Sequence, residues 1–141
     1  MIIVTDQPDA ADLAAIAQGL NTFNDSLVGP SERRTLAVVL HDDSGALIGG
    51  ISSFTAWGWL YVQWLWLAES ARGQGMAGRM LAAAEAEARA RGCHAAWIDS
   101  FNPQAIRAYQ RAGYAEFGSL PDFPRGRTRV FLSKSLKGVT P

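Results

Sequence analysis

The segment from Arg72 to Gly78 has the residue types of a phosphate-binding turn. It reads Arg-Gly-Gln-Gly-Met-Ala-Gly and separates an extended aromatic run from a long alanine-rich stretch. Glycines let the backbone approach a ligand closely, and the free N–H groups at the start of a helix attract phosphate. Arg72 can add a positive charge to the same turn. A strand-to-helix turn that needs glycine only for its shape would have the same composition.

The same glycines allow a second interpretation. Gly73, Gly75 and Gly78 satisfy G-x-G-x-x-G, and Asp99 follows near the end of the next expected strand. This is the dinucleotide fingerprint of an NAD-dependent oxidoreductase. Three features disfavour it: residues 68–72 separate the strand from the first glycine, a β-hairpin precedes the motif, and no second mononucleotide-binding half follows.

The sequence gives little support for a metal site or for a reactive thiol. Cys93 is the only cysteine and follows the expected end of a helix, where a small apolar residue is the ordinary choice. The only histidines are His41 and His94, and no acidic cluster has metal-ligand spacing. We therefore expect no metal site and no disulfide, which favours a reducing, cytoplasmic location.

Composition and charge describe one soluble domain spanning residues 1–141. The chain is 48% hydrophobic and 18% charged, and its 13 basic residues balance 13 acidic ones. A neutral chain has no field that attracts nucleic acid or an anionic membrane, so neither is an expected partner. The start, Met1–Asp6, lacks the basic segment of a signal peptide. The longest apolar run, around Trp57–Ala68, is too short to cross a bilayer.

Periodicity and turn residues predict alternating strands and helices. Asn21–Arg34 is ambiguous, with a short helix ending near Gly29 as one interpretation. The strand–helix–strand order in the middle requires a parallel pair, while the hairpins are antiparallel, so the sheet is mixed. The expected strands are 2–5, 36–41, 46–55, 59–67, 95–101, 114–118 and 128–135, and the expected helices are 9–20, 75 to a stop at Gly92, and 103 to a stop at Gly113.

Two motifs at their expected separation resemble those of the GNAT superfamily of N-acetyltransferases. Arg72, Gly75 and Ala77 form R-x-x-G-x-A, which is similar to that family's acetyl-CoA pyrophosphate loop. The segment from Asn102 to Tyr114 resembles its N-x-x-A-x-x-x-Y-x-x-x-G-F/Y segment. The element order agrees as well. The chain therefore resembles a small, bacterial-type, single-domain member of this family.

The resemblance implies a fold and a cofactor site. The fold is a three-layer α/β arrangement with helices on both faces of a mixed sheet, which splays between its fourth and fifth strands to admit the pantetheine arm of acetyl-CoA. Asn102 would contact the cofactor besides capping the helix that follows it. The other residues implied to hold the arm and the pyrophosphate are Leu65, Trp66, Leu67, Arg72, Gly73, Gln74, Gly75, Met76 and Ala77.

The resemblance also implies the catalytic groups. Tyr109 would protonate the departing thiolate, although a core tyrosine is the alternative. The family's usual glutamate base is missing, since Tyr61, Gln63 and Trp97 occupy its common positions. Asp99 shares a strand face with Trp97. It is therefore the candidate general base, and a carboxylate that holds loop N–H groups is the alternative.

The expected reaction is direct acetyl transfer from acetyl-CoA to a primary amine on a small molecule or peptide. Trp59 and Trp97 are candidates to line an apolar acceptor pocket, although the five tryptophans are expected mostly in core or interface packing. Phe123, Arg125 and Arg127 are further acceptor-side candidates, for which a solvated loop is the alternative. A non-catalytic acyl-CoA binder is the remaining alternative function, and a homodimer is left open.

Overall fold

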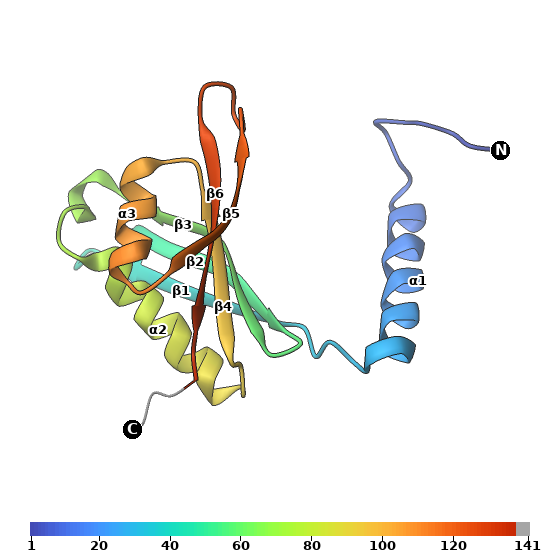
Figure 1. Ribbon diagram of the computed structural model, residues 1–141, viewed down its shortest axis with the longest axis horizontal. Coiled ribbons are helices and arrows are strands. Elements are labelled where there is room, and N and C mark those ends of the chain that lie inside the picture. Colours follow the sequence, from blue (N-terminus) through green and yellow to red (C-terminus); the bar gives the residue numbers. More distant parts are fainter. Residues whose placement is uncertain (138–141) are drawn as a thin grey trace. The chain divides into compact units, whose positions relative to one another are not determined.

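The computed structural model describes residues 1–137 and divides into two compact units, Met1–Ser31 and a second that begins at Glu32 (Figure 1). In the first unit, helix α1 spans Ala10–Val28 and ends at Gly29, whose φ is 86°. The ambiguous segment is thus helical to Val28, because Phe23 continues the spacing of the apolar residues before it. The strand predicted at 2–5 is wrong, since those residues have no regular structure and this unit offers no strand to pair with them.

The second unit is built on a six-stranded mixed sheet in the order β1-β2-β3-β4-β6-β5. Only the β3–β4 pair is parallel. The mixed α/β sheet predicted from the strand–helix–strand order is confirmed. The strands are β1 (Arg34–His41), β2 (Leu47–Ala56), β3 (Trp59–Leu67), β4 (Ala95–Ser100), β5 (Ala115–Pro121) and β6 (Thr128–Ser135).

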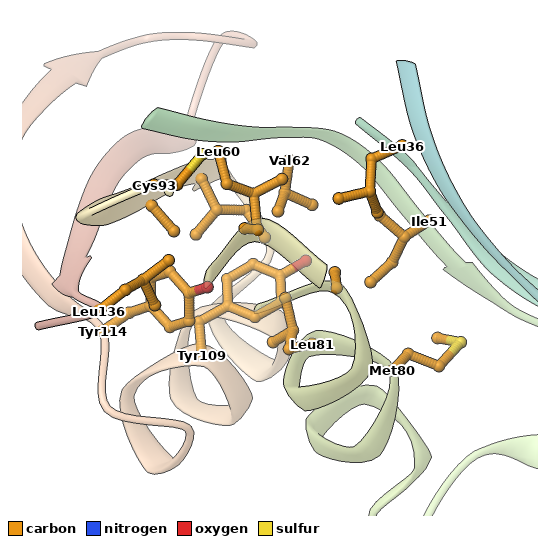
Figure 2. Packing of buried hydrophobic residues seen from close by; sticks show 14 of the residues in the cluster. Leu36, Ile51, Leu60, Val62, Met80, Leu81, Cys93, Tyr109, Tyr114 and Leu136 are labelled. Atoms are coloured by element: carbon orange, nitrogen blue, oxygen red, sulfur yellow. The ribbon is translucent and has the colours of Figure 1, made fainter. Parts of the chain in front are cut away.

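Helices α2 (Met76–Ala90) and α3 (Pro103–Arg111) pack on the same face of this sheet and on each other. A short 3-10 turn, η1 (Glu69–Ala71), connects β3 to the glycine turn before α2. Alternation along the strands sends every second side chain into the core between sheet and helices. Figure 2 shows that core, whose most completely buried large side chains are Leu60, Val62, Leu81, Ile98 and Leu132.

The sheet opens between β3 and β4. Their parallel pairing runs from Trp59 opposite Ala95 to Val62 opposite Ile98 and then stops. β3 continues to Leu67 along β2, with Gln63 as the extra residue of a bulge. A bulge bends its strand and increases the local twist, which turns the end of β3 away from β4. The splay expected between these two strands is present.

A buried charged network ties the helical layer to β6. Glu85 on α2 is 3% exposed. Its carboxylate accepts hydrogen bonds from Lys134 Nζ at 2.7 Å and from the Tyr114 hydroxyl at 2.9 Å. Lys134 also donates to the carbonyl of Ala112, at the end of α3. Burial and the Glu85 carboxylate raise the pKa of Tyr114, so its hydroxyl remains a donor.

Lys134→Met is expected to destabilise the fold by about 3 kcal/mol, because it leaves the Glu85 charge buried without its counter-ion. Urea unfolding followed by tryptophan fluorescence measures this loss. Glu87→Gln is the control, since the Glu87 side chain is 48% exposed where it pairs with Arg91 at i, i+4, and its loss should stay below about 1 kcal/mol. Equal losses in the two variants would contradict a special contribution from the buried pair.

Candidate active site

A cavity of about 760 Å³ is lined by the end of β3, the glycine turn, the first residues of α2 and one face of α3. Nine of the ten residues predicted to bind the cofactor line it, and so does Tyr109. Gln74 does not, because its side chain turns back to donate to the Ser70 carbonyl at 3.0 Å. The nine residues are Leu65, Trp66, Leu67, Arg72, Gly73, Gly75, Met76, Ala77 and Asn102.

Sequence reasoning missed several of the lining residues on α3. Ala105, Ala108 and Ala112 lie on the same helix face as Tyr109 and line the cavity with Gln104. Their spacing of three and four residues places them on one helix face, so they could have been identified from the sequence. Because these side chains are small, the helix presents its backbone close to the cavity.

The glycine turn takes a shape that glycine favours. Gly73 and Gly75 have φ values of 74° and 70°, and Gly75 is the N-cap of α2 without a side-chain cap. A Cβ built at Gly73, Gly75 or Gly78 would meet no atom within 4 Å. The first N–H groups of α2 therefore lack a capping side chain and lie beside open space, where the helix dipole favours an anion.

Two of the polar side chains that line the cavity, Arg72 and Asn102, make hydrogen bonds with nearby backbone groups. Arg72 Nε donates to the Leu67 carbonyl at 3.0 Å, which keeps its positive charge at the turn. Asn102 Oδ1 accepts from the Gln104 N–H at 2.9 Å. The predicted N-cap role of Asn102 is therefore confirmed, and the residue lines the cavity as well.

Tyr109 lies at the inner side of the cavity and is only 5% exposed. Burial, and secondarily the negative charge of Asp99, raises the pKa of Tyr109 to about 12. Its hydroxyl is therefore protonated at neutral pH and can act as a donor.

Asp99 lies on the other face of the sheet and does not line this cavity. It follows the buried Ile98 on β4, so strand alternation turns it away from α2 and α3. Its Oδ2 accepts from Arg129 Nη1 at 2.8 Å, and its Oδ1 accepts from the Tyr61 hydroxyl at 3.4 Å. These partners are a guanidinium and a phenol, rather than the loop N–H groups of the alternative interpretation.

Arg129 and the contact with Tyr61 were not found from the sequence. Arg129 lies two residues before Phe131, the residue of β6 that pairs with Asp99. Proximity to Asp99 therefore depends on the register of two strands that are distant in the chain. The sequence carries no signal that fixes this register.

Aromatic side chains cover much of the sheet face that carries Asp99. Tyr61 stacks on Trp97 with ring centroids 3.9 Å apart, and Phe54 meets Tyr61 edge-on at 5.5 Å. An apolar cavity of about 430 Å³ on this face is lined by Trp59, Trp97, Phe117, Phe131 and Ser133. Trp59 and Trp97 thus line the same cavity, which is the arrangement that an apolar acceptor pocket would need.

None of the five tryptophans, which all belong to the second unit, is buried. The core part of the expected core or interface packing is therefore wrong for them. Strand alternation sends Trp59 and Trp97 to the face opposite α2 and α3. In the turn before β6, Phe123 packs its ring under the Arg129 guanidinium at 4.1 Å. Arg125 and Arg127 in the same turn are exposed, as for a solvated loop.

Residues 1–137 contain no group of three side chains able to hold a metal ion. In the same range no helix has the length and apolarity required to cross a membrane. Cys93 is buried, and this burial raises the pKa of its thiol. The thiol is therefore unsuited to nucleophilic work.

Comparisons with known proteins agree with this geometry. The model of the acetyltransferase (GNAT) family matches residues 8–114. An acetyltransferase of Agrobacterium fabrum is 42% identical over 132 residues, which cover 94% of this chain and 96% of that protein. Blasticidin-S acetyltransferase of Streptomyces morookaense is 41% identical over 95 residues, covering 67% of this chain and 70% of that protein.

A solved structure agrees with this family at the level of the fold. The crystal structure of an Agrobacterium tumefaciens protein assigned to the acetyltransferases matches with a TM-score of 0.90 and 41% identity, covering 96% of this chain and 98% of that one. The chain is therefore an acetyltransferase that belongs to the GNAT family.

Proposed function

We propose that this enzyme moves an acetyl group from acetyl-CoA to a primary amine by direct attack, with both substrates bound together. The observation that carries the proposal is the single 760 Å³ cavity, which gathers the end of β3, the glycine turn and Tyr109. The family match across residues 8–114 supports one N-acetyltransferase domain.

Each part of the cavity suits one part of acetyl-CoA. The backbone of Leu65–Leu67 lies past the point where β3 leaves β4, so its free edge can hydrogen-bond the pantetheine arm. The N–H groups from Gly73 to Ala77 suit the pyrophosphate. Arg72 adds charge there, and Asn102 lines the same cavity as the N-cap of α3.

The transfer step balances with the groups present. Asp99 takes one proton from the acceptor ammonium, directly or through water, and passes it to solvent. The neutral nitrogen then attacks the thioester carbonyl carbon, so a C–N bond forms, the C–S bond breaks, and the nitrogen releases its second proton to solvent. Asp99 Oδ1 suits this role because its contact with Tyr61 is long, at 3.4 Å.

Tyr109 acts on the leaving sulfur. With a pKa of about 12, the phenol is a weaker acid than a thiol, whose ordinary pKa is about 8.5. We therefore propose that it stabilises the negative sulfur mainly by donating a hydrogen bond, and that the thiolate takes its final proton from solvent. In this proposal Tyr109 keeps its expected role as a donor to the sulfur, but it transfers its proton to the thiolate less completely than a general acid would.

The acceptor is proposed to be a small-molecule or peptide amine that approaches from the sheet face carrying Asp99. The 41% identity to a protein named blasticidin-S acetyltransferase supports a small-molecule acceptor. The lone, buried Cys93 suits a cytoplasmic site for the reaction.

Turnover with acetyl-CoA and a panel of amines, measured as free thiol released, tests the proposal. The panel covers polyamines, amino acids, aminoglycosides, nucleoside antibiotics and peptide N-termini. Thiol release that depends on one amine class supports the acetyltransferase. Binding of acetyl-CoA without release for any amine would instead indicate a non-catalytic acyl-CoA binder.

Acetyl-CoA at a hundred times its dissociation constant should stabilise the fold by about 2.7 kcal/mol. NAD should have little effect at the same concentration, because the turn is separated from β3 by η1. Thermal unfolding with each ligand measures the difference. Equal or larger stabilisation by NAD would overturn the cofactor assignment.

Gly75→Glu should weaken acetyl-CoA binding at least about tenfold, since the new carboxylate would lie where the pyrophosphate is expected. Isothermal titration calorimetry measures the change. Gly45→Glu is the matched control, because Gly45 also has a positive φ, of 85°, and open space around it, but lies in the β1–β2 turn. Both substitutions strain the backbone alike, so unchanged affinity in a folded Gly75→Glu protein would contradict the phosphate role.

A further inference from the structure

Arg129 on β6 connects three segments beside Asp99. Its Nη1 atom donates to Asp99 on β4 at 2.8 Å. Its guanidinium lies 4.1 Å from the ring centroid of Phe123, in the turn between β5 and β6, and 5.2 Å from that of Phe101, just after β4. One planar cation thus holds a carboxylate and two aromatic rings from separate segments.

The pair is shielded from water, which strengthens its coupling. The side chains of Arg129 and Asp99 are 21% and 13% exposed. Arg129 Nε is buried and has no hydrogen-bond partner among the described residues. In such surroundings Asp99 and the two rings replace water as the contacts of the guanidinium. The charges of Arg129 and Asp99 therefore interact more strongly than they would in water.

The contacts also orient the carboxylate. Arg129 engages Oδ2, which leaves Oδ1 facing Tyr61 at the long distance of 3.4 Å. The Tyr61 ring is itself fixed by stacking on Trp97. A carboxylate oxygen accepts more than one hydrogen bond, so Oδ1 keeps the capacity to accept from an amine.

We propose that Arg129 is a positioning residue for acetyl transfer: it presents Asp99 Oδ1 to the acceptor amine and, through Phe123, holds the β5–β6 turn beside that carboxylate. This inference rests on the proposed function. It assigns roles to the guanidinium and to Phe123, and leaves the chemical step with Asp99.

The proposal predicts a change in pH dependence. The titratable or charged groups that act on Asp99 come from three elements: Tyr61 on β3, Arg129 on β6 and, through its electrostatic coupling, Tyr109 on α3. Arg129 is the only cation among them. Its removal leaves the carboxylate without its counter-ion and without the contact that orients Oδ1. A misplaced base matters most at low pH, where the neutral amine is rarest.

Arg129→Met and Arg129→Lys, assayed for kcat/KM against pH with the best acceptor from the amine screen, test the role. Arg129→Met should lower kcat/KM at least about tenfold at pH 7, with a loss that shrinks as pH rises and with little change in the KM for acetyl-CoA. Arg129→Lys should recover part of the rate through its charge. The recovery should be incomplete, because lysine lacks the planar guanidinium that stacks on Phe123.

Arg91→Met is the matched control, because Arg91 is also an ion-paired, poorly exposed arginine but lies at the end of α2. It should lower the melting temperature and leave kcat/KM close to the wild-type value at every pH. In an Asp99→Asn background, Arg129→Met should add no more than about a twofold loss, because the effect runs through Asp99. Additive losses in the double variant, or a loss in Arg129→Met that is constant across pH, would overturn the proposal.

A measurement without substrate separates this inference from the proposed function. Hydrogen exchange of the backbone amides in the turn between β5 and β6, which carries Phe123, should be at least about tenfold faster in Arg129→Met than in wild type, because the guanidinium no longer packs on Phe123. A wild-type enzyme that acetylates no amine would contradict the proposed function. Equal exchange of this turn in wild type and Arg129→Met would contradict the positioning role, whether or not turnover is found.

Discussion

Tyr109→Phe is expected to lower kcat by between about tenfold and a thousandfold, with acetyl-CoA affinity nearly unchanged. The substitution keeps the ring in the core and its packing at the inner side of the cavity, and removes only the hydroxyl. The interaction it loses is made mainly as negative charge develops on the sulfur, which is why kcat falls more than binding. Steady-state kinetics and calorimetry together measure the two quantities.

The loss in Tyr109→Phe should not depend on pH in the range of the assay. The pKa of Tyr109 is raised to about 12, so the donor form is fully present below that value and is lost only as pH rises through it. The ratio of wild-type to variant kcat should therefore stay constant between about pH 6 and pH 10.

Tyr114→Phe is the matched control for Tyr109→Phe. Tyr114 is also a buried tyrosine, but its hydroxyl donates to Glu85 rather than lining the cavity. Its removal should lower stability and leave kcat near the wild-type value. Full activity in Tyr109→Phe, or an equal loss of kcat in Tyr114→Phe, would contradict a catalytic role for the Tyr109 hydroxyl.

Most of the residues that gather around the 760 Å³ cavity could be predicted because their signals are local. Gly73 and Gly75 take positive φ values where the sequence pattern requires glycine, and α2 begins directly after them. Asn102 caps α3, and the four-residue spacing of Ala105 and Tyr109 places both on one face. Each feature depends on residues within about one helical turn of each other, where propensity and capping are informative.

The surroundings of Asp99 could not be predicted to the same depth, because they depend on strand register. The partners of Asp99 come from β3 and β6, which are remote in the chain. The exposed tryptophans show a related failure. Aromatic content predicted the strand Trp59–Leu67 correctly, but which face of the sheet the helices cover is a property of the whole fold. The wrong strand at 2–5 has the same origin, since an apolar run forms a strand only beside a partner.

Asp99→Asn should lower kcat/KM most strongly at low pH, and the loss should shrink as pH rises toward the pKa of the acceptor amine. A primary amine with a pKa of about 10.4 is neutral less than once in a thousand at pH 7, and that fraction rises about tenfold with each pH unit. A base is therefore needed most where the neutral amine is rarest.

The pH profile of Asp99→Asn also separates chemistry from structure. Asn keeps the shape of the side chain and an oxygen able to accept from Arg129, but it leaves the guanidinium without its counter-ion, so some loss of stability is expected. A stability effect has no reason to follow the ionisation of the acceptor. Loss of kcat/KM that falls with rising pH, measured on folded protein and compared across two acceptors of different amine pKa, thus identifies Asp99 as the base. A loss that is constant across pH would make Asp99 a purely structural partner of Arg129, and the acceptor would then lose its proton to water or to another group.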